Sequence, residues 1–178
     1  SFPTPRSETP AEMPWVVDGV YTKFNPEIKD NKPEILFVDS GFVGCNLIKC
    51  DVPTVNGRVY PRAVMTKAID DYMKLVREKR SFGVLASEPV YSESINLAEV
   101  SHLVTKVAIT ESGQVQAMVE VLSTPKGLEL SSLLEQGKVV PNLSSIGSIA
   151  PGPIFDNDIE TINDDLCICS VNFVLKHP

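Results

Sequence analysis

The chain has 178 residues, of which 43% are hydrophobic and 22% are charged. A chain of this length buries roughly 70% of its unfolded surface when it folds as one domain. Its net charge of −7 argues against nucleic acid or anionic lipid as a partner, because both attract basic surfaces. No apolar run reaches the roughly 20 residues that a membrane-spanning helix needs.

The N-terminal segment is rich in proline and polar residues. Residues 1–15 lack the basic start and apolar stretch of a signal peptide. Because proline fixes φ and has no N–H to donate, we expect an extended arm here, followed by a single domain over residues 16–178. Ser1 fits removal of an initiator methionine or of a longer leader, and the sequence does not separate the two.

The first half of the domain predicts two strands, a turn and a long helix. Residues 34–50 form two β segments around Gly41 and Gly44, and Asn56-Gly57 is a strong turn signal. A helix is predicted over 61–80, starting at a proline whose missing N–H costs nothing in a first turn. Its apolar residues recur at helical spacing and predict one buried stripe: Met65, Ile69, Tyr72 and Val76.

The second half predicts more strands and one shorter helix. The predicted strands cover 82–86, 100–110, 114–122, 139–150 and 166–175, with a polar loop at 87–94 and a solvated acidic loop at 156–165. Thr124 is the expected N-cap of a helix whose first residue is Pro125, and Gly137 is expected to end it in a left-handed conformation. Many strands with two inserted helices predict an α+β fold with mainly antiparallel pairing.

The four cysteines are arranged as two close pairs, Cys45 with Cys50 and Cys167 with Cys169. A zinc or disulfide clip joining the pairs is one interpretation, but zinc-site spacings are absent. Buried thiols that pack as small hydrophobic side chains are the interpretation we favour. We therefore expect no metal and no cofactor.

Six short motifs follow one another in an order that is more specific than any one of them. They are Asn56-Gly57-Arg58-Val59-Tyr60-Pro61, Phe82-Gly83-Val84-Leu85, Ile95-Asn96-Leu97, Val100-Ser101-His102, Leu122-Ser123-Thr124-Pro125-Lys126-Gly127 and Ser144-Ser145-Ile146-Gly147. Over roughly half the chain, this succession resembles the prohead core protease of tailed bacteriophages, which trims scaffold and capsid proteins during head maturation.

The resemblance implies a fold similar to the herpesvirus assembly protease, a β-barrel with flanking helices that uses a serine nucleophile and a histidine base. The family histidine follows the long helix in a Gly-Glu-Leu-x-His-Pro type segment, where this chain has Ser87 or Glu88. The family nucleophile lies in a Ser-Ser-Arg-Gly type segment. Ser144 and Ser145 match it, but Ile146 replaces the arginine.

The missing histidine matters because a serine hydroxyl must lose its proton to a positioned base as it attacks. Ser87 cannot serve as that base. Glu88 could accept a proton in principle, but a carboxylate exposed to solvent is a weak base toward an alcohol. His102 is the fallback base, although we favour a hydrogen-bonded strand histidine in the barrel wall. His177 lies next to the C-terminus, where we expect a surface residue.

These observations leave three hypotheses. The first, which we favour, is a non-catalytic protein of the phage head, such as a decoration, cement or minor capsid protein, with head proteins or further copies of itself as partners and the virion as its location. The second is an active maturation endopeptidase that uses Ser144 with His102. The third is a scaffolding or host-interaction protein that only shares the fold.

Overall fold

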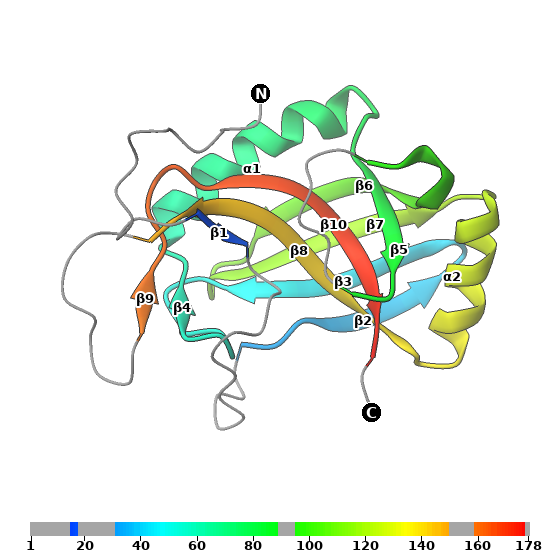
Figure 1. The fold of residues 1–178 in the computed structure, drawn as a ribbon, viewed down its shortest axis with the longest axis horizontal. Coiled ribbons are helices and arrows are strands. Elements are labelled where there is room, and N and C mark those ends of the chain that lie inside the picture. Colours follow the sequence, from blue (N-terminus) through cyan, green and yellow to red (C-terminus); the bar gives the residue numbers. More distant parts are fainter. Residues whose placement is uncertain (1–14, 18–30, 89–94, 150–158, 177–178) are drawn as a thin grey trace.

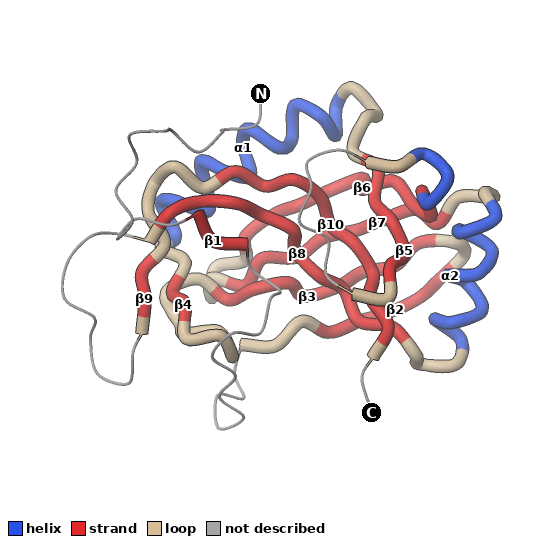
Figure 2. The backbone as a smooth tube through the Cα atoms, in the orientation of Figure 1, coloured by secondary structure: helices blue, strands red, loops and turns tan. Residues whose placement is uncertain are grey.

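The computed structural model describes residues 15–17, 31–88, 95–149 and 159–176. In chain order the elements are β1 (Trp15–Val17), β2 (Glu34–Asp39), β3 (Phe42–Lys49), β4 (Arg58–Val59), α1 (Arg62–Arg77), β5 (Phe82–Ala86), the 3-10 helix η1 (Leu97–Glu99), β6 (Val100–Ile109), β7 (Gln114–Val121), α2 (Pro125–Glu135), β8 (Val139–Ser148), β9 (Glu160–Thr161) and β10 (Cys167–Leu175). Strands make up most of the body, and the helices lie at its periphery (Figure 2).

The main sheet has the strand order β1-β8-β10-β5-β6-β7-β3-β2. It curls strongly, so that β8 comes into contact with β3 and β2 across the interior (Figure 1). The α+β expectation is confirmed, and most neighbouring strands are antiparallel as predicted. The sheet is nevertheless mixed, because β10 runs parallel to β5. It is only half-closed, because its end strands β1 and β2 do not pair with each other. The parallel pair arises because the chain travels through β6, β7, α2 and β8 before it returns beside β5.

Helix α1 covers one side of the curled sheet (Figure 1). It contacts β6 and β10, and its buried stripe consists of Met65, Ala68, Ile69 and Tyr72. Pro61 is the N-cap in extended conformation and not the first helical residue, one position from the prediction. Burial of such a stripe stabilises the helix more than its intrinsic propensity does. None of the helices that the structure describes is long and apolar enough to cross a membrane.

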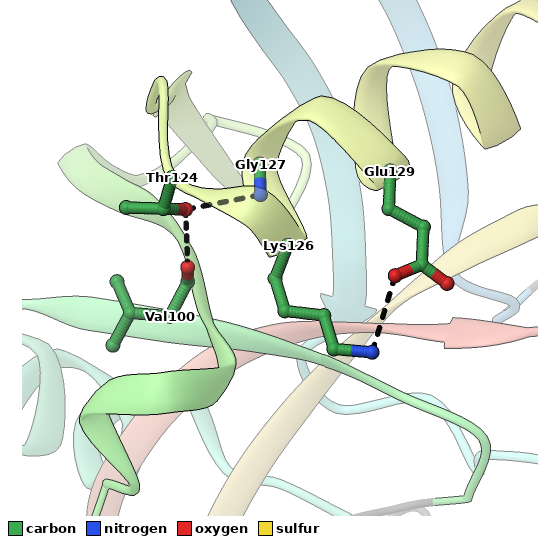
Figure 3. Close-up of polar contacts among 5 residues, drawn as sticks. All are labelled: Val100, Thr124, Lys126, Gly127 and Glu129. Carbon is green, nitrogen blue, oxygen red and sulfur yellow. Dashed lines mark hydrogen bonds and ion pairs between the residues drawn. The ribbon is translucent and has the colours of Figure 1, made fainter.

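Helix α2 is fastened to the start of β6 by its N-cap. The Thr124 hydroxyl donates to the Val100 carbonyl at 2.5 Å and accepts from the Gly127 N–H at 3.0 Å (Figure 3). Lys126 and Glu129 form an exposed ion pair at 3.1 Å on the same turn (Figure 3). The predicted cap and the left-handed Gly137, with φ of 65°, are both confirmed. This junction fixes the point at which β6 enters the sheet.

One expectation for the C-terminal part was wrong in detail. The acidic segment is not wholly a solvated loop, because it contains β9 and the fully buried Ile162, while Asp165 accepts hydrogen bonds from Ser148. β10 has a bulge between Ile168 and Ser170, and beyond it both faces of the strand are buried as far as Val174.

The cysteines differ between the two pairs. Cys45 and Cys50 are buried, whereas Cys167 and Cys169 are half-buried, and none of the four forms a disulfide. Burial raises the pKa of the Cys50 thiol to about 11. The first pair therefore matches the expected buried, protonated thiols.

Candidate functional site

Buried polar side chains gather on three strands, β8, β10 and β6; β10 lies beside β8, and β5 separates it from β6. We call this set the polar cluster. Its members are between 0% and 8% exposed, and they are Ser101, His102, Asn142, Ser144, Ser145, Ser170 and Asn172. Burying so many polar groups is unfavourable unless they bond to one another or to the backbone. The cluster is therefore the part of the sheet in which buried polar side chains replace ordinary apolar core packing.

His102 is held by hydrogen bonds at both ring nitrogens. Its Nε2 lies 2.7 Å from the Val171 carbonyl oxygen, and its Nδ1 lies 2.7 Å from the Ser101 hydroxyl. A carbonyl only accepts, so Nε2 carries the proton and Nδ1 accepts from Ser101. The ring also packs edge-on against Phe173 at a centroid distance of 4.8 Å. These contacts keep the imidazole neutral and fix its orientation.

Burial gives the same result for the protonation state. It lowers the pKa of His102 to about 4, although the bond to Val171 acts in the opposite direction. At neutral pH, Nδ1 is therefore unprotonated, which is the state a general base needs. The pair formed by Ser101 and His102 nevertheless has no access to a substrate, because both residues are 0% exposed.

The His102 ring on β6 reaches Val171 on β10 because the residue of β5 that lies between them is Gly83. Gly83 is paired with His102 across β5 and β6. A Cβ at this position would come closer than 3.0 Å to both His102 Nε2 and the Val171 carbonyl oxygen. Glycine is therefore required here for space, and not for an unusual backbone conformation.

Ser144 and Ser145 lie in the interior of β8, where each is 1% exposed. Ser144 is opposite Ser170 on β10. The Ser170 hydroxyl donates to Asn172 Oδ1 at 3.2 Å, which also accepts the Val84 N–H at 3.0 Å. This network ties β10 to β5.

Three buried polar atoms of the cluster lack a hydrogen-bond partner within the described ranges: Asn142 Oδ1, Ser145 Oγ and Asn172 Nδ2. A buried polar atom without a partner costs about 1–3 kcal/mol. Such atoms commonly mark a functional site or a bound water. They distinguish Ser145 from the fully bonded Ser101.

The structure does not bring the position of the missing family histidine to the serines. Ser87 and Glu88 follow β5 and are exposed. Across the sheet, Leu85 is level with Phe173, and Ser144 is level with Ser170. Because β5 and β10 are parallel, Ser144 is level with residue 82 of β5. Ser87 therefore lies about five residues further along the strand direction. At a rise of about 3.3 Å per residue, this separation is roughly 16 Å.

His102 comes closer to the serines than Ser87 does. Its bonding partner Val171 lies opposite Leu143, the residue that precedes Ser144. The imidazole therefore reaches the strand next to the serines, although its two nitrogens are engaged by other groups. His177 lies outside the residues that the structure describes.

Sequence reasoning missed several members of the cluster. Ser170 and Asn172 alternate with apolar residues within a predicted core strand, and Asn142 has the same pattern in β8. Polar residues at every second position of a strand usually indicate a solvated face. Here both faces are covered, so the pattern identifies a buried network.

A separate pocket of about 710 Å³ lies between α1 and the start of β10. Its lining includes Tyr72, Cys167 and Cys169 but no member of the polar cluster. Tyr72 is 3% exposed and its hydroxyl has no partner among the described residues. Burial raises the pKa of this phenol further above its ordinary value. Because no member of the polar cluster lines this pocket, it gives a substrate no path to Ser144.

Known proteins resemble this chain in fold and not in sequence. No family model matches the sequence, and no curated protein matches it. Among solved structures, the chain is similar to the bacteriophage T4 capsid assembly protease gp21, with a TM-score of 0.69 over 93% of this chain and 98% of that chain. The sequence identity is 17%, so the likeness concerns the fold. The expected prohead-protease-like fold is thereby confirmed.

Proposed function

We propose that this protein is a non-catalytic structural protein of a tailed-phage head, a decoration, cement or minor capsid protein, built on the fold of a prohead protease. The observation that carries the proposal is the state of His102. In the part of the chain that the structure describes it is the sole histidine, and both its ring nitrogens are engaged in a fully buried site.

The surroundings of the family motifs support the same conclusion. The position of the family base is occupied by exposed residues roughly 16 Å along the strands from Ser144. Ile146, which replaces the family arginine, is 9% exposed and belongs to the packed interior of β8. The motifs that shape the fold are kept, whereas the family histidine and arginine are replaced by residues that lack their chemistry, exposed Ser87 or Glu88 and packed Ile146.

A second candidate, an active serine endopeptidase, is favoured by one feature. His102 Nε2 bonds to the strand that lies beside Ser144, so a rearranged pair would not need a different fold. To act as a base toward Ser144, the imidazole would have to give up Ser101 or Val171 and become accessible to a substrate. Loss of the base from a serine triad lowers the rate by several powers of ten.

The proposal is tested by measuring cleavage together with virion content. We expect the purified protein to leave scaffold-derived and capsid-derived peptides intact, to resist labelling by a serine-directed phosphonate, and to be present at full length in mature particles. Cleavage that is lost in Ser144→Ala and in His102→Gln, and retained in the control Ser87→Ala, would establish the endopeptidase instead. Copy number separates the structural roles, since hundreds of copies indicate a lattice position.

A further inference from the structure

The two ends of the main sheet are finished differently. At one end β1 pairs with β8 and covers its edge. At the other end β2 is the last strand, paired on one side with β3. In an antiparallel edge strand, every second residue directs its N–H and C=O away from the sheet. The β2 edge therefore presents backbone groups that another strand can bind.

This edge also carries a concentration of exposed apolar side chains. Of the seven large hydrophobic residues that are exposed in the described part, four lie between 36 and 42. They are Leu36 (46% exposed), Phe37 (44%), Val38 (51%) and Phe42 (37%). Phe37 lies across Gly44 of β3, where a Cβ would clash with its ring. Contiguous exposed apolar side chains on an unpaired edge are typical of a binding surface.

The charges next to this surface are negative. Glu34 and Asp39 are exposed at the two ends of β2, and Glu120 lies opposite Phe42 on the neighbouring strand. Residues 34–42 contain no Lys or Arg. Neither end carboxylate has an ion pair within the described residues; Glu34 accepts from Asn46 and Asp39 from Ser40. A segment with basic side chains at its ends would complement this edge.

The same charges disfavour a second copy of the chain. Glu34, Phe37 and Asp39 face one side of the sheet, and Ile35 and Val38 face the other. If two copies paired along the whole of β2 about a two-fold axis, Glu34 of each copy would lie opposite Asp39 of the other. Such a dimer would therefore contain this carboxylate pair two times. Directly opposed like charges are destabilising in antiparallel pairs.

We propose that the β2 edge is a docking site for an extended segment of a partner protein, which adds to the sheet as an antiparallel strand. The segment has apolar side chains at alternate positions, which cover Val38 on one face of the sheet, and Lys or Arg near both ends, which meet Glu34 and Asp39 on the other face. The backbone provides affinity, and the side chains provide register and specificity. This inference is independent of whether the protein cleaves peptides.

The probe is a labelled synthetic peptide of roughly seven residues, a common strand length, with valine at alternate positions and lysine at both ends. Its matched controls are the same peptide with alternate backbone amides N-methylated, and one with glutamate in place of lysine. Binding to the full chain is measured by fluorescence anisotropy, and protection of the β2 amides by hydrogen exchange. We expect the lysine peptide to bind and both controls to be weaker by about tenfold or more.

The protein variants locate the site. Val38→Lys places a charge on the edge and is expected to weaken binding about tenfold. Leu97→Lys, at a residue that is 76% exposed on η1, is the control and should bind like wild type. The double variant Glu34→Lys, Asp39→Lys should reverse the preference between the lysine and glutamate peptides.

Three results would overturn the proposal. The first is that the lysine peptide does not bind. The second is that Val38→Lys and Leu97→Lys weaken peptide binding equally. The third is a concentration-dependent dimer in sedimentation that Val38→Lys abolishes. The last result would assign the edge to a second copy of the chain.

Discussion

The middle of the sheet and its β2 edge depart from ordinary protein anatomy in opposite ways. In the middle, the polar cluster around His102 is at most 8% exposed. At the edge, Leu36, Phe37 and Val38 are each more than 40% exposed. Buried polar groups and exposed apolar patches are the two informative exceptions to the usual distribution of residues. The first is inaccessible to any partner, whereas the second has about half of each side chain exposed.

The middle of the sheet and the β2 edge therefore differ in what their side chains contact. In the middle, Ser101, His102 and Ser170 are held in fixed hydrogen bonds, which stabilise a unique arrangement of strands. At the edge, Ile35 packs against the core, whereas Leu36, Phe37 and Val38 remain exposed. The proposed structural role is consistent with this division.

The largest expected effect comes from the first of two glycines that each lie against a side-chain ring, Gly83 in the middle and Gly44 at the edge. Gly83→Ala forces a Cβ against His102 Nε2 and the Val171 carbonyl, and neither can move in the packed middle. We expect the free energy of unfolding to fall by about 4 kcal/mol, as for severe overpacking. Urea denaturation followed by circular dichroism measures the change.

Gly44→Ala is the matched change at the edge. Its Cβ meets only the ring of Phe37, which is 44% exposed and can rotate into solvent. The expected loss is below about 1 kcal/mol. Equal losses in the two variants would mean that the β2 edge is packed as rigidly as the middle.

The second effect depends on pH and belongs to the middle alone. The pKa of His102 is lowered to about 4 in the fold, against an ordinary value of 6.5. Between these values the unfolded chain binds the proton and the folded chain does not, so stability is present above pH 6.5 and is lost as the pH falls toward 4. The loss attributable to His102 is about 3 kcal/mol.

His102→Gln isolates this contribution, because every carboxyl group titrates equally in both proteins. Glutamine retains a donor for the Val171 carbonyl but does not titrate. The free energy of unfolding of the wild type should exceed that of the variant by less at pH 4 than at pH 7.5. The decrease in this difference should be most of the loss of about 3 kcal/mol attributed to His102. A constant difference would show that the imidazole is solvated in the folded protein.

The secondary structure could be predicted from local patterns, whereas the chemistry of the site could not. Helix α2 followed directly from Thr124, Pro125 and Gly137, since caps act within a few residues. The role of Gly83 depends on β6 and β10 lying on either side of it, and no local pattern specifies this arrangement. The parallel pairing of β10 with β5 is equally non-local, which is why an antiparallel barrel was expected.

The candidate site shows the same limit. The resemblance to the prohead proteases identified Ser144, Ser145 and His102, and the structure places them in one region of the sheet. It did not identify Ser170 or Asn172, because their polar alternation looks like a solvated strand face. Burial of both faces is a property of the whole sheet, and single-strand periodicity does not contain it.

A third prediction compares two serines within the polar cluster. Ser101→Ala removes the donor to His102 Nδ1 and leaves a buried acceptor unpaired, so we expect a loss of about 1–3 kcal/mol. Ser145→Ala removes a hydroxyl that has no partner among the described residues, and we expect a change within about 0.5 kcal/mol or a slight gain. Thermal and urea unfolding of both variants give the difference. A larger loss for Ser145→Ala would indicate a bound water or an undetected partner at its hydroxyl.

The smallest expected effect tests the edge itself. Val38 and Val43 are cross-strand partners on β2 and β3, yet Val38 is 51% exposed and Val43 is 0% exposed. Valine to threonine keeps the shape of the side chain and adds a hydroxyl. We expect Val43→Thr to cost about 1.5 kcal/mol through burial of that hydroxyl, and Val38→Thr to stay within about 0.5 kcal/mol, as at an exposed position. If Val38→Thr were as costly as Val43→Thr, the apolar side chains of β2 would belong to the core of the protein, and the edge would have no apolar surface to offer a partner strand.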